Sequence, residues 1–426
     1  MSRIKTVIFT LILSFCFYLP YAAAEEPLAW KDCVKEAAKN HPDLIAAEEA
    51  VNQSKAAKTI TASTLYPQID TSLNASTART SSASGPATTS NNYNYGASAS
   101  QLLFDGLKTV NNVKAASENI KAAQYNYRFT STEIRLRLRS AFLNLLNAQE
   151  SIKINKDIFD IRRSDLELIT LRYESGMEHK GALLNSEANL AQAEFQINQA
   201  KRAREVAQRQ LIKEMGRTQF SDISVKSDFA LVENTTQLPD FDGLADKNPN
   251  LGKFIAQKNA AAFGIKSAEA DFFPHLSGQA QANKNGSHWP PRGDEYNAGL
   301  SLTFPLFEGG LRFAQVSSAK AQFNQAKENE RSTKDTIIFT LEQTWAALHD
   351  AIETVAVQKK FLSAAEERYR IAEAQYSLGL LQYDNWTIIE DTLVRTKTSV
   401  LDAETQALQA EANWIQAKGE TLEYAQ

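Results

Sequence analysis

The chain has 426 residues, of which 43% are hydrophobic and 23% are charged, and its formal net charge is −4. This content of aliphatic and aromatic residues is too high for a disordered chain, and the acidic balance argues against a nucleic-acid partner. Beyond the N-terminal segment, charges interrupt every apolar run, so no later transmembrane helix is expected.

Residues 1–24 have the pattern of a signal peptide. Arg3 and Lys5 provide a positive start, an apolar run follows over residues 6–19, and a small-residue site precedes Glu25. We therefore expect the mature chain to begin at Glu25. Removal of the two basic residues would lower the formal charge from −4 to −6.

The two cysteines predict neither a lipid anchor nor a disulfide. Cys16 follows Phe15 inside the apolar run, whereas a lipidated cysteine would follow a small residue. Cleavage leaves Cys33 as the only thiol, which excludes an intramolecular disulfide. A secreted chain without disulfides needs a sizeable core or an assembly.

The remaining chain consists of two tandem copies of one sequence unit. The motif Leu-Phe-Asp/Glu-Gly ends at Gly106 and again at Gly309, and Tyr-x-x-Gly ends at Gly176 and again at Gly379. Both motifs recur at an offset of 203 residues. Such a long-period repeat predicts two copies of one structural unit.

The first repeat, residues 25–216, is expected to contain, in chain order, a helix at about 28–64, strands at about 66–81 and 91–105 separated by a loop at 82–90, and helices at about 107–172 and 182–215. Residues 217–248 form an irregular connecting segment with small strands. The second repeat, residues 249–426, is expected to contain a helix at about 249–270, strands at about 272–283 and 295–307 around a loop at 284–294, and helices at about 310–375 and 385–418.

The expected strands alternate between apolar and polar residues. From Tyr296 to Leu306, every second residue is apolar, with only Pro305 breaking the polar set between them. This period of two is typical of membrane-barrel strands, but also of a soluble antiparallel sheet packed on a helix. The polar loops, which resemble exposed hairpin tips, favour the membrane interpretation.

Four strands cannot close a barrel alone, because known barrels begin at eight. Open edges are not tolerated in hydrocarbon, where each unpaired backbone group costs several kcal/mol. Several chains must therefore pool their strands: two copies would supply about eight, three copies about twelve.

The two longest helices exceed the size of a compact domain. Each would extend roughly 100 Å at 1.5 Å per residue. Seam residues beginning at Ile134 and, 203 residues later, at Ile337 step by four and three, as in a coiled coil. An elongated soluble scaffold would share this pattern, so the strands are needed to favour a channel.

These motifs identify a family resemblance. The opening segment Leu28 to Leu44, the Leu-Phe-Asp/Glu-Gly junctions and the Tyr-x-x-Gly turns followed by Glu187 or Glu390 resemble the outer-membrane efflux proteins typified by TolC. The resemblance covers nearly the whole expected mature chain. It implies a homotrimer with a twelve-stranded β-barrel in outer-membrane lipid and a long α-helical coiled-coil barrel in the periplasm.

The resemblance also implies partners. Such a duct joins an inner-membrane pump through a periplasmic adaptor protein and carries cargo passively in efflux or type I secretion. The cargo and the type of pump stay open. The alternative is a soluble periplasmic coiled-coil scaffold with no pore.

The two distal turns are the candidate functional sites. By resemblance, the adaptor would contact the turns near Gly176, Lys180, Gly379 and Leu380. Lys180 and the neighbouring His179 are interpreted either as solvated tip residues or as an ionic latch.

By the same resemblance, Tyr376 matches a residue of the pore constriction. We hypothesise that Asp384 and Asn385 line that constriction, although the acidic pattern of the family is not reproduced. The alternative is that both residues only cap the next helix, with Thr387 and Glu390 as a capping box.

No enzymatic chemistry is indicated. The five histidines lack the spacing of metal ligands, and neither a phosphate-binding loop nor a nucleophile elbow is present. We therefore expect no catalytic centre, no metal and no cofactor.

Overall fold

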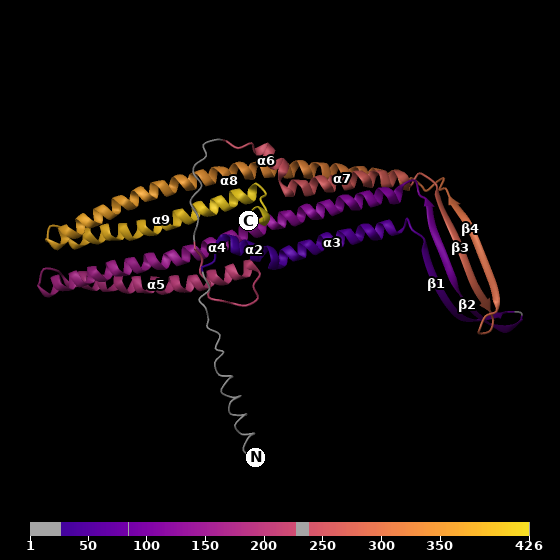
Figure 1. Cartoon of the computed structure of the whole chain (residues 1–426), viewed down its shortest axis with the longest axis horizontal. Helices are drawn as coiled ribbons and strands as arrows, with labels where there is room; N and C mark the ends of the chain where they lie inside the picture. Colours follow the sequence, from indigo (N-terminus) through magenta and orange to yellow (C-terminus); the bar gives the residue numbers. More distant parts are fainter. Residues whose placement is uncertain (1–26, 84, 227–237, 426) are drawn as a thin grey trace, which may run out of the picture.

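The computed structural model describes residues 27–83, 85–226 and 238–425. The protein is a long rod of helices with a β-sheet at one end (Figure 1). The expected signal peptide, residues 1–24, lies outside the described residues.

The same order of elements occurs twice. The first repeat contains α2 (Trp30–Asn40), α3 (Pro42–Ser63), β1 (Gln68–Ser82), β2 (Gly85–Phe104), α4 (Lys108–Glu174) and α5 (Lys180–Met215). After α6 (Phe241–Lys247), the second repeat contains α7 (Pro249–Ala270), β3 (His275–Gly286), β4 (Gly293–Thr303), α8 (Leu311–Ser377) and α9 (Tyr383–Ala417), followed by the short η1 (Leu422–Ala425). The predicted duplication and the mixed, mainly helical fold class are confirmed.

The first expected helix is two helices. The backbone of His41 is extended (φ −68°, ψ 122°) and separates α2 from α3. The cause is Pro42, because a proline disfavours the helical conformation of the residue before it. The His41 ring accepts a hydrogen bond from the Asp43 amide and so caps α3.

Three further expectations differ from the structure. The loop expected at 82–90 is mostly strand, because β2 begins at Gly85 and threonines, which favour strands, pair across the hairpin. β4 ends at Thr303 instead of 307, since Pro305 lacks the amide hydrogen that a ladder requires. The connecting segment contains the helix α6. Asp240 caps the N-terminus of this helix, because its side chain accepts a hydrogen bond from the Gly243 amide.

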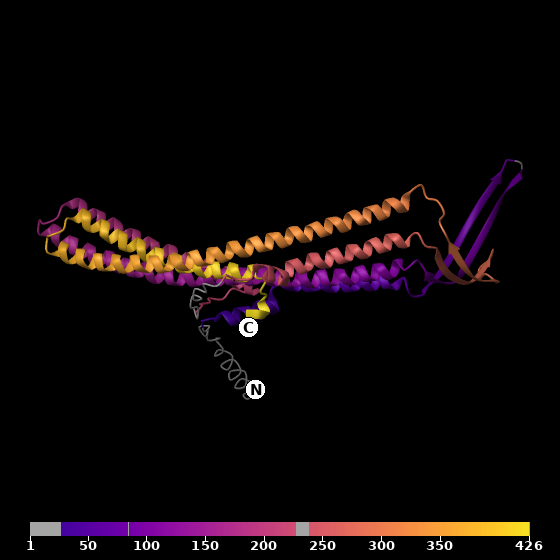
Figure 2. The ribbon, with the colours of Figure 1, turned by 90° about the horizontal axis from the view of Figure 1, so that it is seen from above.

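The sheet is antiparallel in the order β1-β2-β3-β4, so the two repeats join through the pairing of β2 with β3. The sheet extends from the end of the helical rod, and in the perpendicular view none of the described helices lies over it (Figure 2). Every residue of β4 is exposed, on both faces. The alternative of a sheet packed on a helix is therefore wrong.

The helices pack as two antiparallel hairpins, α4 with α5 and α8 with α9, while α3 and α7 cover the halves of α4 and α8 nearer the sheet (Figure 1). α4 and α8 have 67 residues each, which corresponds to roughly 100 Å. Among the predicted seam residues, Ile134, Leu138, Ile337 and Leu341 are buried, whereas Ile152, Thr344 and Ala351 are half-buried.

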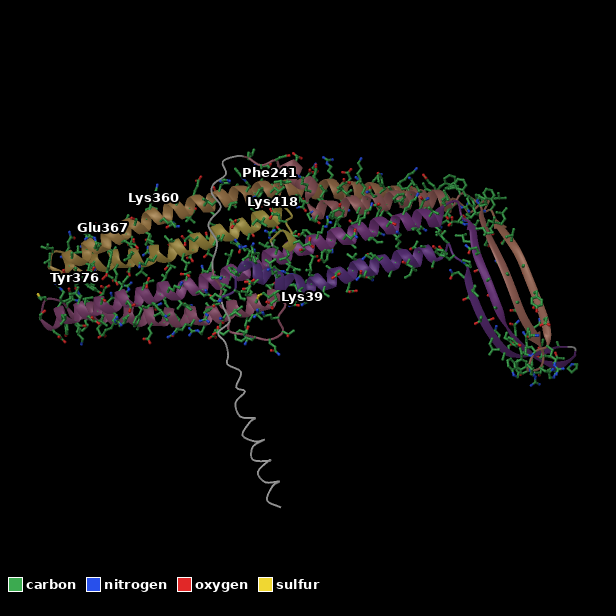
Figure 3. The ribbon with its side chains drawn as sticks, in the orientation of Figure 1. Lys39, Phe241, Lys360, Glu367, Tyr376 and Lys418 are labelled. Carbon is green, nitrogen blue, oxygen red and sulfur yellow. The ribbon has the colours of Figure 1, made fainter. Side chains whose placement is uncertain are left out.

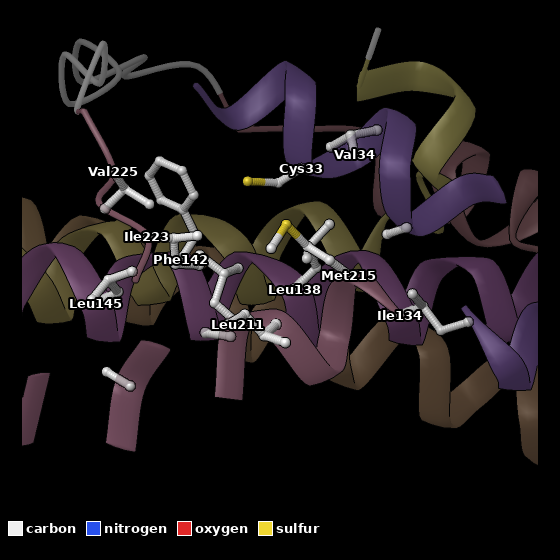
Figure 4. Packing of buried hydrophobic residues seen from close by; sticks show 14 of the residues in the cluster. Cys33, Val34, Ile134, Leu138, Phe142, Leu145, Leu211, Met215, Ile223 and Val225 are labelled. Atoms are coloured by element: carbon white, nitrogen blue, oxygen red, sulfur yellow. The ribbon is translucent and has the colours of Figure 1, made fainter. Parts of the chain in front are cut away.

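The largest core lies midway along the rod, where α2 and the segment after α5 pack onto α4 and α5 (Figure 4). Phe142 and Leu138 of α4 meet Met215 of α5 and Cys33 of α2 there. Burial raises the pKa of the Cys33 thiol to about 12, so this cysteine is an inert core residue. This core joins α2 to the first hairpin, and the distal turns lie at the end of the rod opposite the sheet.

Candidate functional site

The sheet has one apolar and one polar face, both uncovered. The cross-strand register puts Ile69, Ala99, Ala280 and Ala298 in one row, since paired residues point to the same face. The next row on the opposite face is Asp70, Ser98, Gln281 and Asn297. In these two rows the residues of all four strands share one chemical character, apolar on one face and polar on the other.

The apolar face is strongly exposed in one chain. Tyr296 is 78% exposed, Leu300 74% and Ile69 73%. A soluble monomer rarely displays so large an apolar surface without a partner or a membrane. The outer edges of β1 and β4 also carry no partner within the described chain.

Aromatic side chains gather at both ends of the sheet. At the hairpin end, Trp289 lies 6.2 Å from Tyr93 and 6.0 Å from Tyr95, ring centre to ring centre. At the helical end, Phe272 and Phe313 are 5.2 Å apart. Aromatic girdles of this kind flank the apolar band of membrane barrels.

The two distal turns, opposite the sheet, have the same backbone structure. Gly176 and Gly379 adopt left-handed φ values of +74° and +76°. The Met177 amide donates to the Arg172 carbonyl oxygen and the Leu380 amide to that of Gln375, each at 2.8 Å. Both turns are therefore Schellman motifs, which need glycine at the left-handed position.

Tyr376 ties the two hairpins together at the tip (Figure 3). Its ring stacks on Trp386 with 4.3 Å between ring centres, and the Arg172 guanidinium lies 4.7 Å from its centre on the other hairpin. Its hydroxyl donates to Glu178 Oε2 at 2.9 Å. Burial, reinforced by that carboxylate, raises the pKa of Tyr376.

The Tyr376 side chain is fully buried within one protomer. Its contacts with Trp386 and Arg172 hold the start of α9 against the first hairpin. The neighbouring Tyr383 receives a hydrogen bond from Asn185 at 2.8 Å and reinforces the same link between hairpins.

Asp384 and Asn385 are exposed on the first turn of α9. The capping alternative is wrong for both residues, because Gln382 occupies the N-cap position. The capping box is wrong as well: Thr387 lies beyond the first turn, and Glu390 pairs with Arg162.

The residues expected to meet an adaptor are at the surface. Lys180 begins α5 and is exposed, and Leu380 is 76% exposed in the second turn. His179 is the N-cap of α5, where its ring accepts a hydrogen bond from the Ala182 amide at 3.1 Å. Its Nε2 lies 3.8 Å from Glu178 Oε1.

Sequence reasoning missed a buried charged cluster above the tip. Arg162 of α4 lies 2.6 Å from Glu390 Oε2 and donates to Asp391 Oδ1 at 2.6 Å. Asp165, one turn along α4, accepts from the Tyr369 hydroxyl at 3.1 Å. The signal was available: Ile158, Arg162, Asp165 and Ile169 step by four, three and four, so charges occupy seam positions.

Within residues 27–83, 85–226 and 238–425, no three histidine, cysteine or carboxylate side chains are grouped to hold a metal ion. In the same described part of the chain, every helix is too short or too polar to cross a membrane.

Comparison with known proteins adds independent evidence. The family model described as outer membrane efflux protein matches residues 33–217 and 242–423. The outer membrane efflux protein BepC of Brucella suis biovar 1 (strain 1330) is 22% identical over 334 residues, which are 78% of this chain and 72% of BepC. The alkaline protease secretion protein AprF of Pseudomonas aeruginosa is 25% identical over 203 residues, 45% of this chain and 42% of AprF.

Solved structures show the same fold. The outer membrane protein VceC from Vibrio cholerae superposes with a TM-score of 0.79 and 18% identity. The superposition covers 92% of this chain and 96% of VceC, so it includes sheet and helical rod together.

Proposed function

The chain belongs to the outer membrane efflux protein family, and from that premise we propose that three copies form one continuous duct from the periplasm to the exterior. Each protomer is located in the outer membrane through its sheet, and its helices extend into the periplasm. The duct supplies a path for cargo, and the energy comes from a separate pump.

The observation that carries this proposal is the uncovered two-faced sheet. Its apolar face fits acyl chains and its polar face fits a wet lumen. Its two open edges can be satisfied in hydrocarbon only by strands of other copies. A soluble periplasmic scaffold would leave this apolar face and both edges in water.

The number of copies follows from the need for a passage. Two copies would supply eight strands, and the interior of an eight-stranded barrel is just wide enough for side chains to fill it. Three copies would supply twelve strands and leave an opening. A twelve-stranded barrel agrees with the trimer that the family resemblance implies.

The exposed distal turns support a contact with a periplasmic adaptor, which would connect the duct to an inner-membrane pump. Met177 is 63% exposed in the first turn and Leu380 76% in the second, so each turn presents an apolar residue to a partner. BepC is named for efflux and AprF for protease secretion. Efflux and type I secretion are therefore the two proposed settings.

Planar-bilayer recordings test the channel. The purified oligomer is expected to give discrete conductance steps, and their absence at every voltage would contradict the proposal. The same recordings test whether Asp384 and Asn385 line the periplasmic constriction. Asp384→Ala should raise conductance and weaken block by cations, whereas unchanged values would remove Asp384 from the constriction.

A further inference from the structure

We propose that α8 of one copy binds α5 of the next copy, with Asp350 of one chain facing Arg202 of the other and Glu353 facing Lys201. This contact rests on the proposed multi-chain duct. It adds to that proposal which helices meet between copies, in which register and in which direction.

The distal half of the rod has two outer edges. Between the core and the distal turns, neighbouring helices contact one another in the order α5, α4, α9 and α8, so that α5 and α8 lie at the edges (Figure 1). The two repeats meet in the middle, at the contact of α4 with α9, which we call the internal seam. There Asn147 of α4 donates a hydrogen bond to the hydroxyl of Thr405 of α9 at 2.7 Å.

The duplication gives each edge helix a counterpart in the internal seam. α8 is equivalent to α4, and α9 to α5, at the offset of 203 residues. Asp350 therefore occupies the position of Asn147, and Arg202 occupies the position of Thr405. Asn147 and Thr405 are half-buried, whereas Asp350 and Arg202 are exposed. If α5 of another copy packed against α8, it would repeat the geometry of the internal seam.

Glu353 and Lys201 are related in the same way. Their equivalents, Glu150 and Glu404, line one groove of about 730 Å³ between α4 and α9. Glu150 and Glu404 are half-buried, and Glu353 and Lys201 are exposed. The face that is covered in the internal seam is thus uncovered on both edge helices.

The charges on the two uncovered faces are complementary. In the register of the internal seam, Asp350 on α8 faces Arg202 on α5, and one turn further along α8, Glu353 faces Lys201. Among the described residues, none of these four side chains forms an ion pair within its own chain. Opposite charges in matching positions fix the register of two helices and favour their association.

Apolar side chains match in the same register. Val357 lies seven residues after Asp350 on α8, and Phe195 lies seven residues before Arg202 on the antiparallel α5. Seven residues are about two helical turns, so each lies on the same side of its helix as the charged residue. Val357 is 49% exposed and Phe195 53%. Both would be covered by the proposed contact.

The distribution of charge also sets the direction of assembly. A contact of α8 with α8 would bring Asp350 and Glu353 of two chains together, and a contact of α5 with α5 would do the same with Lys201 and Arg202. Like charges in contact disfavour both arrangements. The remaining arrangement joins different faces of successive copies, which closes into a ring and excludes a two-fold dimer through these helices.

Cross-linking tests the register. The pair Val357→Cys and Phe195→Cys keeps every charge of the contact, and Cys33 is buried and does not compete. A short bis-thiol reagent should join these chains into covalent dimers and trimers in outer-membrane fractions. The control pair Glu367→Cys and Phe195→Cys is ten residues out of register along α8, about 15 Å, and should give little linked product. No linked product from the first pair, or equal amounts from both pairs, would overturn the contact.

A charge swap tests the ionic pair. Asp350→Arg and Arg202→Asp should each lower the temperature at which the extracted oligomer dissociates by several degrees, and the double variant should recover most of that loss. Asp350→Arg combined with Lys39→Asp has the same net charge but changes an exposed lysine of α2, and it should recover nothing. Unchanged single variants, or equal stability of the two double variants, would overturn the pairing of Asp350 with Arg202.

The contact and the duct fail separately in these tests. An oligomer that is extracted intact but gives no cross-link between positions 357 and 195 would remove the contact and leave the duct in place. Wild-type chains that are extracted singly would refute the duct itself, and the contact with it.

Discussion

The two ends of the rod differ in the exposure of their large apolar side chains. At the sheet, Tyr296 and Leu300 are more than 70% exposed, and both outer strand edges are open among the described residues. At the tip, Tyr376 and Trp386 are fully buried and joined within one chain. The sheet end is therefore completed by lipid and other copies, whereas the tip is already packed in each protomer.

Because of this difference, we expect the sheet to govern assembly and the tip to govern opening. A change on the sheet should affect whether the protein inserts and oligomerises, because every copy contributes to the barrel. A change at the tip should affect how tightly the hairpins are held, with the oligomer intact. The following predictions test that separation, from the largest expected effect to the smallest.

Leu300→Lys places a charge on the apolar face of β4. In a membrane barrel such a change costs up to about 2–4 kcal/mol, and three copies would lose roughly three times that. We expect loss of the heat-resistant oligomer from outer-membrane fractions. Ser301→Lys, one residue along on the polar face, is the control, and equal loss in both variants would contradict the assignment of the faces.

Trp386→Ala removes the ring on which Tyr376 stacks. A buried tryptophan replaced by alanine costs about 3–5 kcal/mol, and here the loss is local to the tip. Hydrogen exchange should accelerate in α9 near residue 386 while the oligomer persists. The control is Ile388→Ala, a substitution of a side chain that is 61% exposed, and it should change hydrogen exchange little. Disassembly of the Trp386→Ala oligomer would contradict the idea that the tip does not affect assembly.

Tyr376→Phe removes one hydrogen bond and keeps the stack. The bond to the Glu178 carboxylate is charge-assisted, so its loss should cost about 1.5 kcal/mol. We expect more frequent channel opening at unchanged single-channel conductance. Conductance that changes without a change in opening would instead mean that the hydroxyl faces the lumen.

Gly379→Ala tests the second turn alone. The added methyl group meets no atom within 4 Å, so only the left-handed backbone (φ +76°) opposes it, at about 1 kcal/mol. Proteolysis at the turn should increase slightly. Gly264→Ala, within α7 and equally free of contacts, should be neutral or stabilising.

The long helices and the four strands could be predicted because each depends on local periodicity, and the repeat could be predicted because its motifs recur at a fixed offset of 203 residues. The coiled-coil steps that begin at Ile134 and the alternation around Leu300 are visible in the sequence alone. The ends of the helices and strands were harder to predict. Pro42 divides a continuous apolar pattern into two helices. A Ser/Thr-rich stretch near Thr80 forms a strand because it pairs with the neighbouring strand.

The tip shows why side-chain roles could not be predicted. The family resemblance implies Tyr376 at the pore constriction, and that stays a prediction. Its partners Arg172 and Glu178 lie about 200 residues earlier, on the other repeat. Contacts at that separation depend on how two hairpins pack. The charged cluster around Glu390 also forms through the packing of the two hairpins. In the sequence, only the charged residues at coiled-coil seam positions indicated it.

The proposed channel requires that the sheet be one part of a barrel shared between chains. The mass of the detergent-extracted complex, measured by native mass spectrometry, tests this claim without reference to cargo or partners. We predict three chains per particle in the wild type. A particle with a single chain, stable in detergent and still inserted in the outer membrane, would contradict a barrel shared between chains.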